Sequence, residues 1–366
     1  MFTRTAARVA LSACMILFLT SCAASADVAS RDSAVTLDPS APLEQLEFLA
    51  DPHSFTGEST AILADDAVPV PSVTPQQTLP TTVTSHDLAG DVEVTVASTQ
   101  RILAMDISGS IAATVYGLGF GDRLVGRDIS TTFEQAKNLP VITSSGHSVN
   151  SEAILALRPT VLITDGSIGP IDVVLQLRDA GIAVVFVDTD PSIEGVGTLA
   201  REVAAALGAP AAGDELATRL VDGINAKAEQ IASLVPPAKP LRIVFLYLRG
   251  NSGVYYLFGE ESGADVLITA LSAVDVAAEL GLVGNRPLTD EAMVAANPDL
   301  ILVMTDGLAS VGGVDALLEA KPAIGLTTAG QNRRFVDMAD GEILSFGPRT
   351  ASVLDALARA IYAPGR

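Results

Sequence analysis

The sequence predicts an α/β protein of two Rossmann-like lobes, each with a mainly parallel sheet, joined by one long α-helix with a ligand cleft between the lobes. Three observations lead to this expectation. Short β-rich apolar runs alternate with Ala- and Leu-rich segments of helical spacing. One apolar stripe continues through about six helical turns in the middle of the chain. A pattern in the first half of the chain recurs in the second half.

Composition and charge exclude several classes of protein. The 366 residues include 22 Lys and Arg, 43 Asp and Glu, three His, two Cys and no Trp, so the net charge is −21. Nucleic-acid binding is not expected, because so acidic a chain cannot replace the counterions of a phosphate backbone. Three His and two Cys are too few for a His- and Cys-rich metal cage. The chemistry of the protein must rest on few residues.

Residues 1–21 have the pattern of a lipoprotein signal peptide. Arg4 and Arg8 precede an apolar run at 9–19 that is too short to span a bilayer. The sequence Leu-Thr-Ser-Cys then ends at Cys22 and resembles a bacterial lipobox. We expect Cys22 to carry two acyl chains and to anchor the protein on the outer face of the cytoplasmic membrane. An ordinary signal peptide, cleaved a few residues later, is the alternative.

Residues 22–91 have the composition of a disordered, lipid-anchored tether. The segment 23–100 has twelve acids against one base and holds more than half of the net charge. It is rich in Ser, Thr, Asp and Ala, and four prolines lie between residues 69 and 80. Such a segment is expected to be extended and self-repelling. The sequence is also compatible with a short helix near residues 43–49.

Residues 92–209 are expected to form the first lobe. The glycines at 117, 119 and 121 follow a helical stretch that begins at Ser110, whereas a dinucleotide-binding fingerprint follows a strand, so we interpret them as turn residues. The sequence contains no phosphate loop, nucleophile elbow or HExxH motif. Strands are predicted at residues 92–96, 102–105, 161–164 and 183–188.

A connecting helix is predicted at residues 210–236. The part with the apolar stripe, residues 214–235, would be about 33 Å long over about 22 residues, enough to pass from one lobe to the other. Prolines at 236, 237 and 240 end it. Its apolar stripe consists of Leu216, Leu220, Ile224, Ala228, Ile231 and Val235. The second lobe, residues 237–366, has predicted strands at 241–248, 254–258, 300–304 and 334–338.

A weak internal repeat supports two similar lobes. Residues 150–164 and 289–303 each have a polar N-cap, an acid in the first turn, a short helix closed before Pro, and an apolar strand. The acids, Glu152 and Glu291, stand at the same distance from that proline in both copies. Duplication of a lobe accounts for this equal spacing better than chance recurrence of a common unit.

Five local motifs resemble those of a known family. They are Asp-Ile-Ser-Gly-Ser at 106–110, Gly-Phe-Gly-Asp-Arg-Leu-Val-Gly-Arg-Asp at 119–128, Gly-His-Ser-Val-Asn at 146–150, Tyr-Leu-Arg-Gly at 247–250 and Phe-Gly-Pro-Arg at 346–349. With the lipobox, the tether and the helix-linked lobes, they resemble the actinobacterial haem-binding lipoproteins of the HmuT type. These belong to the helix-linked class III periplasmic binding proteins of ABC importers for siderophores, cobalamin and haem. The resemblance covers roughly residues 96–362.

The resemblance implies a receptor and not an enzyme. Such a receptor captures ferric haem b outside the cytoplasm and delivers it to an ABC permease with its ATPase. Upstream haem-donor proteins are a further expected partner. Contact with the membrane is expected through the lipid anchor only.

Three residues of these motifs are the expected iron site. His147 lies in a polar loop after a short strand, where a neutral imidazole can ligate haem iron. Tyr247 ends the first strand of the second lobe, and its phenolate would be a hard ligand for ferric iron. Arg249, two residues on, projects to the same face and can stabilise that phenolate. We expect six-coordinate haem between His147 and Tyr247. Taken alone, these residues equally fit a surface histidine, a half-buried tyrosine and a surface arginine.

Further contacts are expected from charge and residue type. Arg349 and Arg127 are candidates for binding the haem propionates. Glu152 and Glu291, which the resemblance places on the top surface of each lobe, are expected to pair with arginines of the permease. As first-turn acids they also favour the helix dipole. Candidates for the apolar walls of the cleft are Tyr116, Phe120, Tyr255, Tyr256, Leu257 and Phe258.

Other functions stay open. A siderophore or cobalamin receptor would use the same scaffold, although an aromatic content of 4% favours it less. A zinc or manganese receptor would need three or four His or carboxylate ligands in its cleft. A lipid-anchored haem enzyme would leave one iron position open for substrate, and an adhesion module would bind no small ligand.

Overall fold

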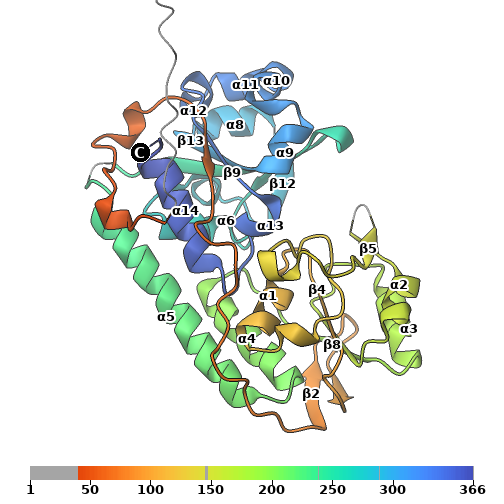
Figure 1. Ribbon diagram of the computed structural model, residues 1–366. Coiled ribbons are helices and arrows are strands. Elements are labelled where there is room, and N and C mark those ends of the chain that lie inside the picture. Colours follow the sequence, from red (N-terminus) through yellow and green to blue (C-terminus); the bar gives the residue numbers. More distant parts are fainter. Residues whose placement is uncertain (1–39, 145–146, 238, 288, 366) are drawn as a thin grey trace, which may run out of the picture. The chain divides into compact units, whose positions relative to one another are not determined.

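The computed structural model describes residues 40–144, 147–237, 239–287 and 289–365, which belong to one compact unit (Figure 1). The expected signal peptide, Cys22 and the first part of the expected tether lie outside these residues. Within the described part, no helix has the length and apolar character needed to cross a membrane. The two predicted α/β lobes are present, so the predicted fold class is confirmed.

The first lobe is built on a parallel sheet with helices on both faces. Side chains of the sheet alternate between two apolar cores, one with α1 and α4 and the other with α2 and α3. Its strands, in sheet order, are β4 (Ile102–Met105), β7 (Val161–Thr164) and β8 (Ala183–Phe186). A small hairpin pairs β5 (Thr143–Ser144) with β6 (Ser148–Val149). The helices are α1 (Ser110–Gly117), α2 (Ser151–Leu157), α3 (Ile171–Asp179) and α4 (Ile193–Ala206).

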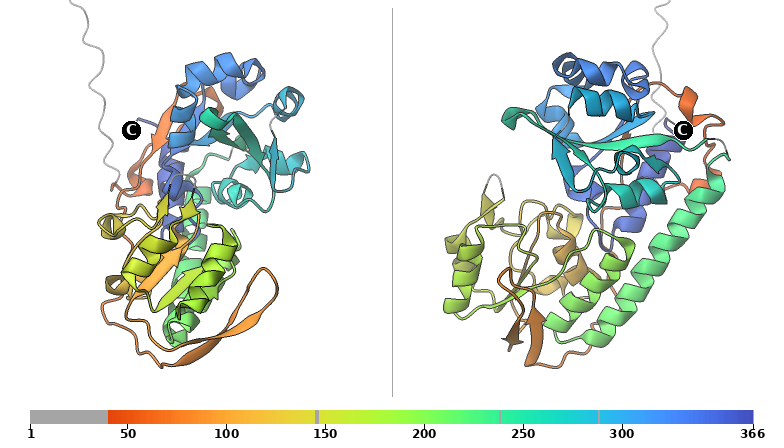
Figure 2. Two further views of the ribbon diagram at one scale, coloured as in Figure 1. Left: turned by 90° about the vertical axis from the view of Figure 1, so that its right-hand side faces the viewer. Right: turned by 180° about the vertical axis from the view of Figure 1, so that it is seen from behind.

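The connecting helix is α5 (Pro210–Leu234), which begins with proline at its first position, where no intrahelical N–H bond is lost. Its apolar stripe serves both lobes. Leu216 is buried in the core of the first lobe, whereas Ile224 and Ile231 are buried in the core of the second. The helix runs beside α4 of the first lobe and α14 (Thr350–Tyr362) of the second (Figure 1, Figure 2).

The second lobe has a mixed sheet in the order β1-β14-β13-β9-β10-β12, with β11 paired to β9. The strands β1, β14, β13, β9 and β11 pair in parallel, whereas β10 and β12 are antiparallel additions beyond β9. The strands are β1 (Ser59–Ala61), β9 (Arg242–Arg249), β10 (Val254–Phe258), β11 (Val274–Asp275), β12 (Asn285–Pro287), β13 (Leu300–Met304) and β14 (Phe335–Met338).

Helices cover both faces of this sheet. The face toward α5 also packs against α6 and α14, and the opposite face packs against α8 and α10. The helices, besides α14, are α6 (Ala264–Ala270), α7 (Val276–Glu279), α8 (Asp290–Ala296), α9 (Thr305–Ser310), α10 (Gly313–Ala320), α11 (Pro322–Gly325), α12 (Thr328–Gln331) and α13 (Asp340–Ile343).

Residues 40–91 are ordered, so the prediction of a disordered tether is wrong for this part of the chain. The strand β1 forms the edge of the second lobe's sheet, and β2 (Thr81–Ser85) forms a hairpin with β3 (Val92–Val96) on the first lobe. Leu43 is 1% exposed in the core of the second lobe, and Val68 is 1% exposed in the core of the first. Composition failed to show this because pairing with distant strands, rather than local propensity, stabilises these short segments.

The internal repeat has the same local structure in both lobes. The side chain of Asn150 accepts from the N–H of Ala153 at the start of α2, and Thr289 accepts from Ala292 at the start of α8. Both helices end with a residue in the left-handed region and are followed by a buried parallel strand, β7 or β13. The two copies therefore place equivalent helix N-termini on the two lobes.

Candidate functional site

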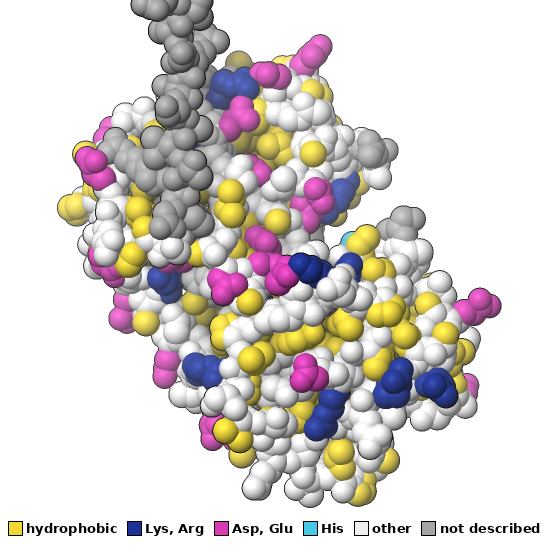
Figure 3. Space-filling model, in the orientation of Figure 1, with side chains coloured by type: hydrophobic (Ala, Val, Ile, Leu, Met, Phe, Trp, Pro, Cys, Tyr) yellow, Lys and Arg dark blue, Asp and Glu magenta, His cyan; other side chains and the backbone are white. Residues whose placement is uncertain are grey.

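A cavity of about 960 Å³ lies between the two lobes. On the first lobe it is lined by the loops that follow β4, β7 and β8, and on the second by β9, β10 and the segment after β14. Ligands of α/β proteins collect at the carboxyl ends of parallel strands, and most of this lining lies there. Figure 3 shows the hollow on one face of the molecule, with acidic and basic side chains along it.

His147 lines the cavity from the turn of the β5–β6 hairpin. Its Nδ1 atom is buried and has no hydrogen-bond partner among the described residues. Burial lowers the pKa of His147, and the positive charge of Arg249 lowers it further. The imidazole is therefore neutral at neutral pH and can offer a lone pair to a metal ion. His53 and His86, which lie in the segment predicted to be a disordered tether, also belong to the ordered part of the chain.

Tyr247 and Arg249 line the cavity from the second lobe. Both side chains point to one face of β9, as their spacing predicts, and the guanidinium Cζ of Arg249 lies 4.5 Å from the centroid of the Tyr247 ring. The ring of Phe258, on the neighbouring strand, stacks on Tyr247 with 5.4 Å between centroids. The Tyr247 hydroxyl makes no hydrogen bond to any described residue, so its oxygen is available to a ligand.

Asp340 holds Arg249 in place. Its Oδ2 accepts from Arg249 Nη2 at 2.8 Å, and its Oδ1 accepts from the N–H of Asp306 at 2.9 Å. Burial raises the pKa of Asp340, and the charge of Arg249 opposes that rise. No sequence pattern signals this pair, because its members are 91 residues apart.

Two of the matched motifs meet in a buried carboxylate pair at the first lobe's side of the cavity. Asp106 accepts from the N–H groups of Ser110 and Ile111 at the start of α1, at 2.9 and 3.1 Å. Asp128 accepts from the N–H groups of Asp106 at 3.1 Å and Thr131 at 2.7 Å. Burial, together with the charge of Asp106, raises the pKa of Asp128 to about 7. These bonds fix the two loops whose hydroxyl groups line the cavity.

Arg349 and Arg127 do not line the cavity, so the structure does not support them as propionate ligands. Arg349 is 2% exposed, forms an ion pair with Asp66 at 2.8 Å and lies over the ring of Phe133. Arg127 donates to the carbonyl groups of Asp128 and Thr131. Both guanidinium groups hold loops together. The sequence around these arginines did not indicate this role, because it depends on contacts made in the folded chain.

The predicted wall residues divide between the cavity and the cores. Tyr256 and Phe258 line the cavity, whereas Tyr116, Phe120 and Leu257 are buried in the cores and Tyr255 is packed under Lys321. Most of the remaining lining was not predicted from the sequence. Its apolar members are Ile107, Ile129, Pro191, Leu199, Met304, Ala339, Leu344 and Phe346. Ile107 and Phe346 lie inside two of the quoted motifs, which was the available signal.

Glu152 and Glu291 are exposed first-turn acids of α2 and α8. Neither has a hydrogen bond or ion pair with another described side chain. They occupy equivalent positions in the two lobes, as the repeat predicts.

Comparison with known proteins agrees with this architecture. A family model described as periplasmic binding protein matches residues 107–340. YvrC of Bacillus subtilis (strain 168), an uncharacterised ABC transporter substrate-binding lipoprotein, is 25% identical over 279 residues, which are 75% of this chain and 84% of that protein.

Solved structures of haem-binding proteins are also similar. The haem-binding protein HmuT is 40% identical, with a TM-score of 0.78 over 85% of this chain and 99% of that chain. The periplasmic haem-binding protein RhuT from Roseiflexus sp. RS-1, in apo form, is 36% identical, with a TM-score of 0.65 over 74% of this chain and 100% of that chain.

HmuT has also been solved as variants in which a tyrosine, the arginine two positions after it, or a histidine is replaced by alanine. The matched proteins are binding and transport proteins rather than enzymes. The family model covers well over half of this chain, and the two-lobe fold is shared. The chain therefore belongs to the periplasmic binding protein family.

Proposed function

We propose that this protein is an extracytoplasmic receptor that captures ferric haem b in the cleft between its lobes and delivers it to an ABC permease with its ATPase. The observation that carries the proposal is that His147 and Tyr247 line one cavity from opposite lobes. The 40% identity to the haem-binding protein HmuT supports haem as the cargo. The HmuT variants replace the same three residue types, with the same spacing between tyrosine and arginine.

The two side chains suit the two axial positions of ferric iron. His147 is neutral because its pKa is lowered, so no proton competes with the metal at neutral pH. Tyr247 offers a phenol oxygen that is free of hydrogen bonds within the described structure, and the guanidinium of Arg249 lies over its ring. Two protein ligands close both axial positions, which suits carriage of haem rather than catalysis.

The rest of the lining suits an amphipathic, planar cargo. Apolar side chains from both lobes, among them Tyr256, Phe258 and Phe346, can cover the macrocycle. Among the described lining residues, Arg249 is the one cation and five are acids. The lining hydroxyl groups of Ser108 and Ser110 already donate to Asp106, and those of Ser167 and Thr189 donate to Asp165. The propionates therefore fit best against the hydroxyl groups of Ser130 and Thr132, which also line the first lobe's side of the cavity.

The location and partners of the receptor follow from residues outside the cavity. Cys22 in the lipobox would anchor the mature chain on the outer face of the cytoplasmic membrane. Glu152 and Glu291, exposed at equivalent places, would pair with basic residues of the permease and orient it across both lobes. Haem-donor proteins upstream of the receptor are a further proposed partner.

Separate titrations with three candidate ligands test the choice of cargo. Full-length protein is titrated in parallel with haemin, cyanocobalamin and a ferric hydroxamate siderophore, and binding is followed by the melting temperature. The proposal predicts a rise in melting temperature with haemin and none with the other two. A larger rise with cobalamin or the siderophore would overturn the assignment of haem and favour another cargo of the same scaffold.

A further inference from the structure

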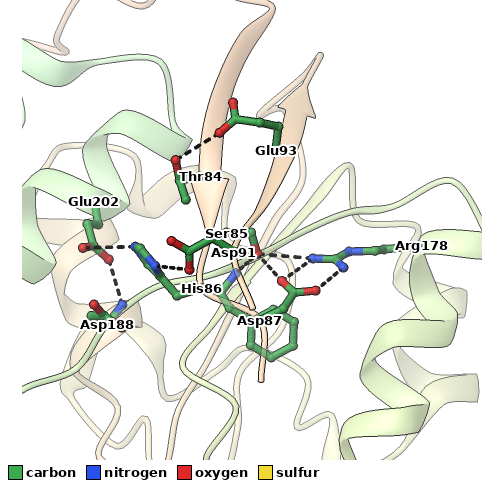
Figure 4. A network of polar contacts seen from close by, with 10 residues as sticks. Thr84, Ser85, His86, Asp87, Asp91, Glu93, Arg178, Asp188 and Glu202 are labelled. Atoms are coloured by element: carbon green, nitrogen blue, oxygen red, sulfur yellow. Dashed lines mark hydrogen bonds and ion pairs between the residues drawn. The ribbon is translucent and has the colours of Figure 1, made fainter. Parts of the chain in front are cut away.

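A cluster of one imidazole and three carboxylates lies on the first lobe, and none of its members lines the cavity (Figure 4). His86 directly follows β2, and Asp91 directly precedes β3, so both belong to the N-terminal hairpin. Asp188 follows β8, and Glu202 lies on α4. The ligand atoms of His86, Asp188 and Glu202 all lie within 4.8 Å of one another. The cluster thus joins three elements that are distant in sequence.

Asp91 and the backbone of β8 fix the orientation of the His86 imidazole. Its Nδ1 lies 3.0 Å from Oδ1 of Asp91, and its backbone N–H donates to the carbonyl of Phe186 at 2.9 Å. Figure 4 shows the ring between Asp91 on one side and Glu202 on the other. A carboxylate on one ring nitrogen fixes the tautomer and leaves the other nitrogen as the donor to a metal.

The second ring nitrogen faces an oxygen that has no other bond. His86 Nε2 lies 3.7 Å from Oε1 of Glu202, which is too long for a hydrogen bond. The other oxygen of Glu202 accepts from the N–H of Asp188 at 2.8 Å, which fixes the carboxylate. Donor atoms at about 2.0 to 2.2 Å from a tetrahedral metal lie about 3.3 to 3.6 Å from one another. The pair therefore needs only a small movement to share a cation.

The donor set selects the kind of cation. Three carboxylates surround one imidazole, so the cluster attracts positive charge. Magnesium and calcium prefer sites made of oxygen atoms alone, whereas an imidazole nitrogen with carboxylates suits zinc and its neighbours in the first transition series. We propose that His86, Asp188 and Glu202 bind a divalent cation of the zinc type, with Asp91 orienting His86.

Such a cation would pin the N-terminal hairpin to the first lobe. Arg178 already holds this hairpin from the other side through a bidentate pair with Asp87 (Figure 4). Loss of the cation therefore leaves the hairpin attached, and variants in the cluster are expected to fold. Bound zinc adds stability because it binds the folded chain, which alone brings the three ligands together.

Calorimetric titration of the full-length protein with zinc chloride tests the site. The wild type is expected to bind one equivalent that His86→Gln abolishes and that Asp188→Asn weakens at least tenfold. Asp188 is the sharper probe because its side chain is exposed and makes no hydrogen bond or ion pair with another described residue. Zinc is also expected to raise the melting temperature of the wild type, with reversal by a chelator, and to leave that of His86→Gln unchanged.

Matched variants separate this site from the other histidines. His53→Gln changes a half-buried histidine that contacts Lys239 and Asp299, and it is expected to keep the zinc equivalent. His147→Gln, in the cavity, is expected to keep it as well. The proposal is overturned if the wild type binds no zinc, or if His86→Gln and Asp188→Asn titrate like the wild type. It is also overturned if His147→Gln removes the equivalent, because the zinc then lies in the cavity.

Discussion

The guanidinium of Arg249 lies over the ring of Tyr247, with its Cζ 4.5 Å from the ring centroid, and Asp340 holds it there through a 2.8 Å ion pair. The cation is thereby placed beside the proposed iron ligand, in the lining of the same cavity. It also acts across the cleft, since its charge lowers the pKa of His147. Arg249 thus contacts one proposed ligand, Tyr247, and favours the neutral, metal-binding form of the other, His147.

Replacing Arg249 should weaken haem binding without abolishing it. A cation over an aromatic ring contributes roughly 0.5 to 2 kcal/mol, so Arg249→Ala is expected to lower haemin affinity about 2- to 30-fold. Asp340→Asn should have a smaller effect of the same sign, because Arg249 stays but is less well held. Arg242→Ala, on the same strand but outside the cavity, is the control. Equal affinities for Arg249→Ala and the control would contradict this role.

Haem binding through His147 should persist below the usual pKa of histidine. Protonation of the imidazole competes with iron, and burial lowers the pKa of His147 below its ordinary value of about 6.5. In the Tyr247→Ala variant, where His147 is the remaining proposed ligand, haemin binding should hold as pH falls through 6.5 and be lost only at lower pH. Adding Arg249→Ala should move that midpoint upward. The Soret absorbance against pH gives both midpoints, and a first midpoint above 6.5 would refute the prediction.

Much of the fold could be predicted from sequence because its central elements are locally consistent. The strands at 102–105, 161–164, 254–258 and 300–304 are apolar runs with the predicted bounds, and the stripe of α5 has helical spacing. The strands β1 and β2 were missed. They are short and rich in Ser and Thr, and they are stabilised by pairing with β14 and β3. The local sequence pattern does not indicate such pairing partners.

The segment before residue 92 should contribute to global stability. Leu43 is 1% exposed, so Leu43→Ala is expected to lower the free energy of unfolding by about 2 to 5 kcal/mol through lost burial and a cavity. Leu88→Ala, at a side chain that is 89% exposed in the same segment, should change it by less than about 0.5 kcal/mol. Urea denaturation compares the two. Equal midpoints would mean that the segment behaves as a tether after all.

The sequence predicted those residues of the candidate site whose side chains are themselves suited to bind iron or to tune an iron ligand. His147, Tyr247 and Arg249 were identified by their ligand chemistry, their spacing and the family resemblance, and the structure brings all three to one cavity. Asp340 was missed, because nothing near it in the sequence indicates its pairing with Arg249. Arg349 was predicted to bind a haem propionate, and the local sequence could not show that it is instead buried against Phe133, because that is a tertiary contact.

Charge reversal at the two exposed acids should separate binding from delivery. Glu152 and Glu291 lie outside the cavity, so the haemin affinity of the Glu152→Arg, Glu291→Arg double variant should stay within about twofold of the wild-type value. Growth on haem as the iron source should fall sharply in cells that carry the permease and this variant. Glu215→Arg with Glu229→Arg, at two exposed acids of α5, makes the same change in net charge and is the control. Uptake equal to that of the control would show that these acids do not dock the permease.

Absorption titration with haemin tests whether His147 and Tyr247 both ligate the iron, by comparing the Soret band of the wild type with those of His147→Ala, Tyr247→Ala and the double variant. Axial ligation from both lobes predicts a shifted band and weaker binding for each single variant, and no protein-bound Soret band for the double variant. His53→Ala and Tyr255→Ala, which change the same residue types outside the cavity, should match the wild type. A double variant whose Soret band and affinity equal those of the wild type would contradict the account.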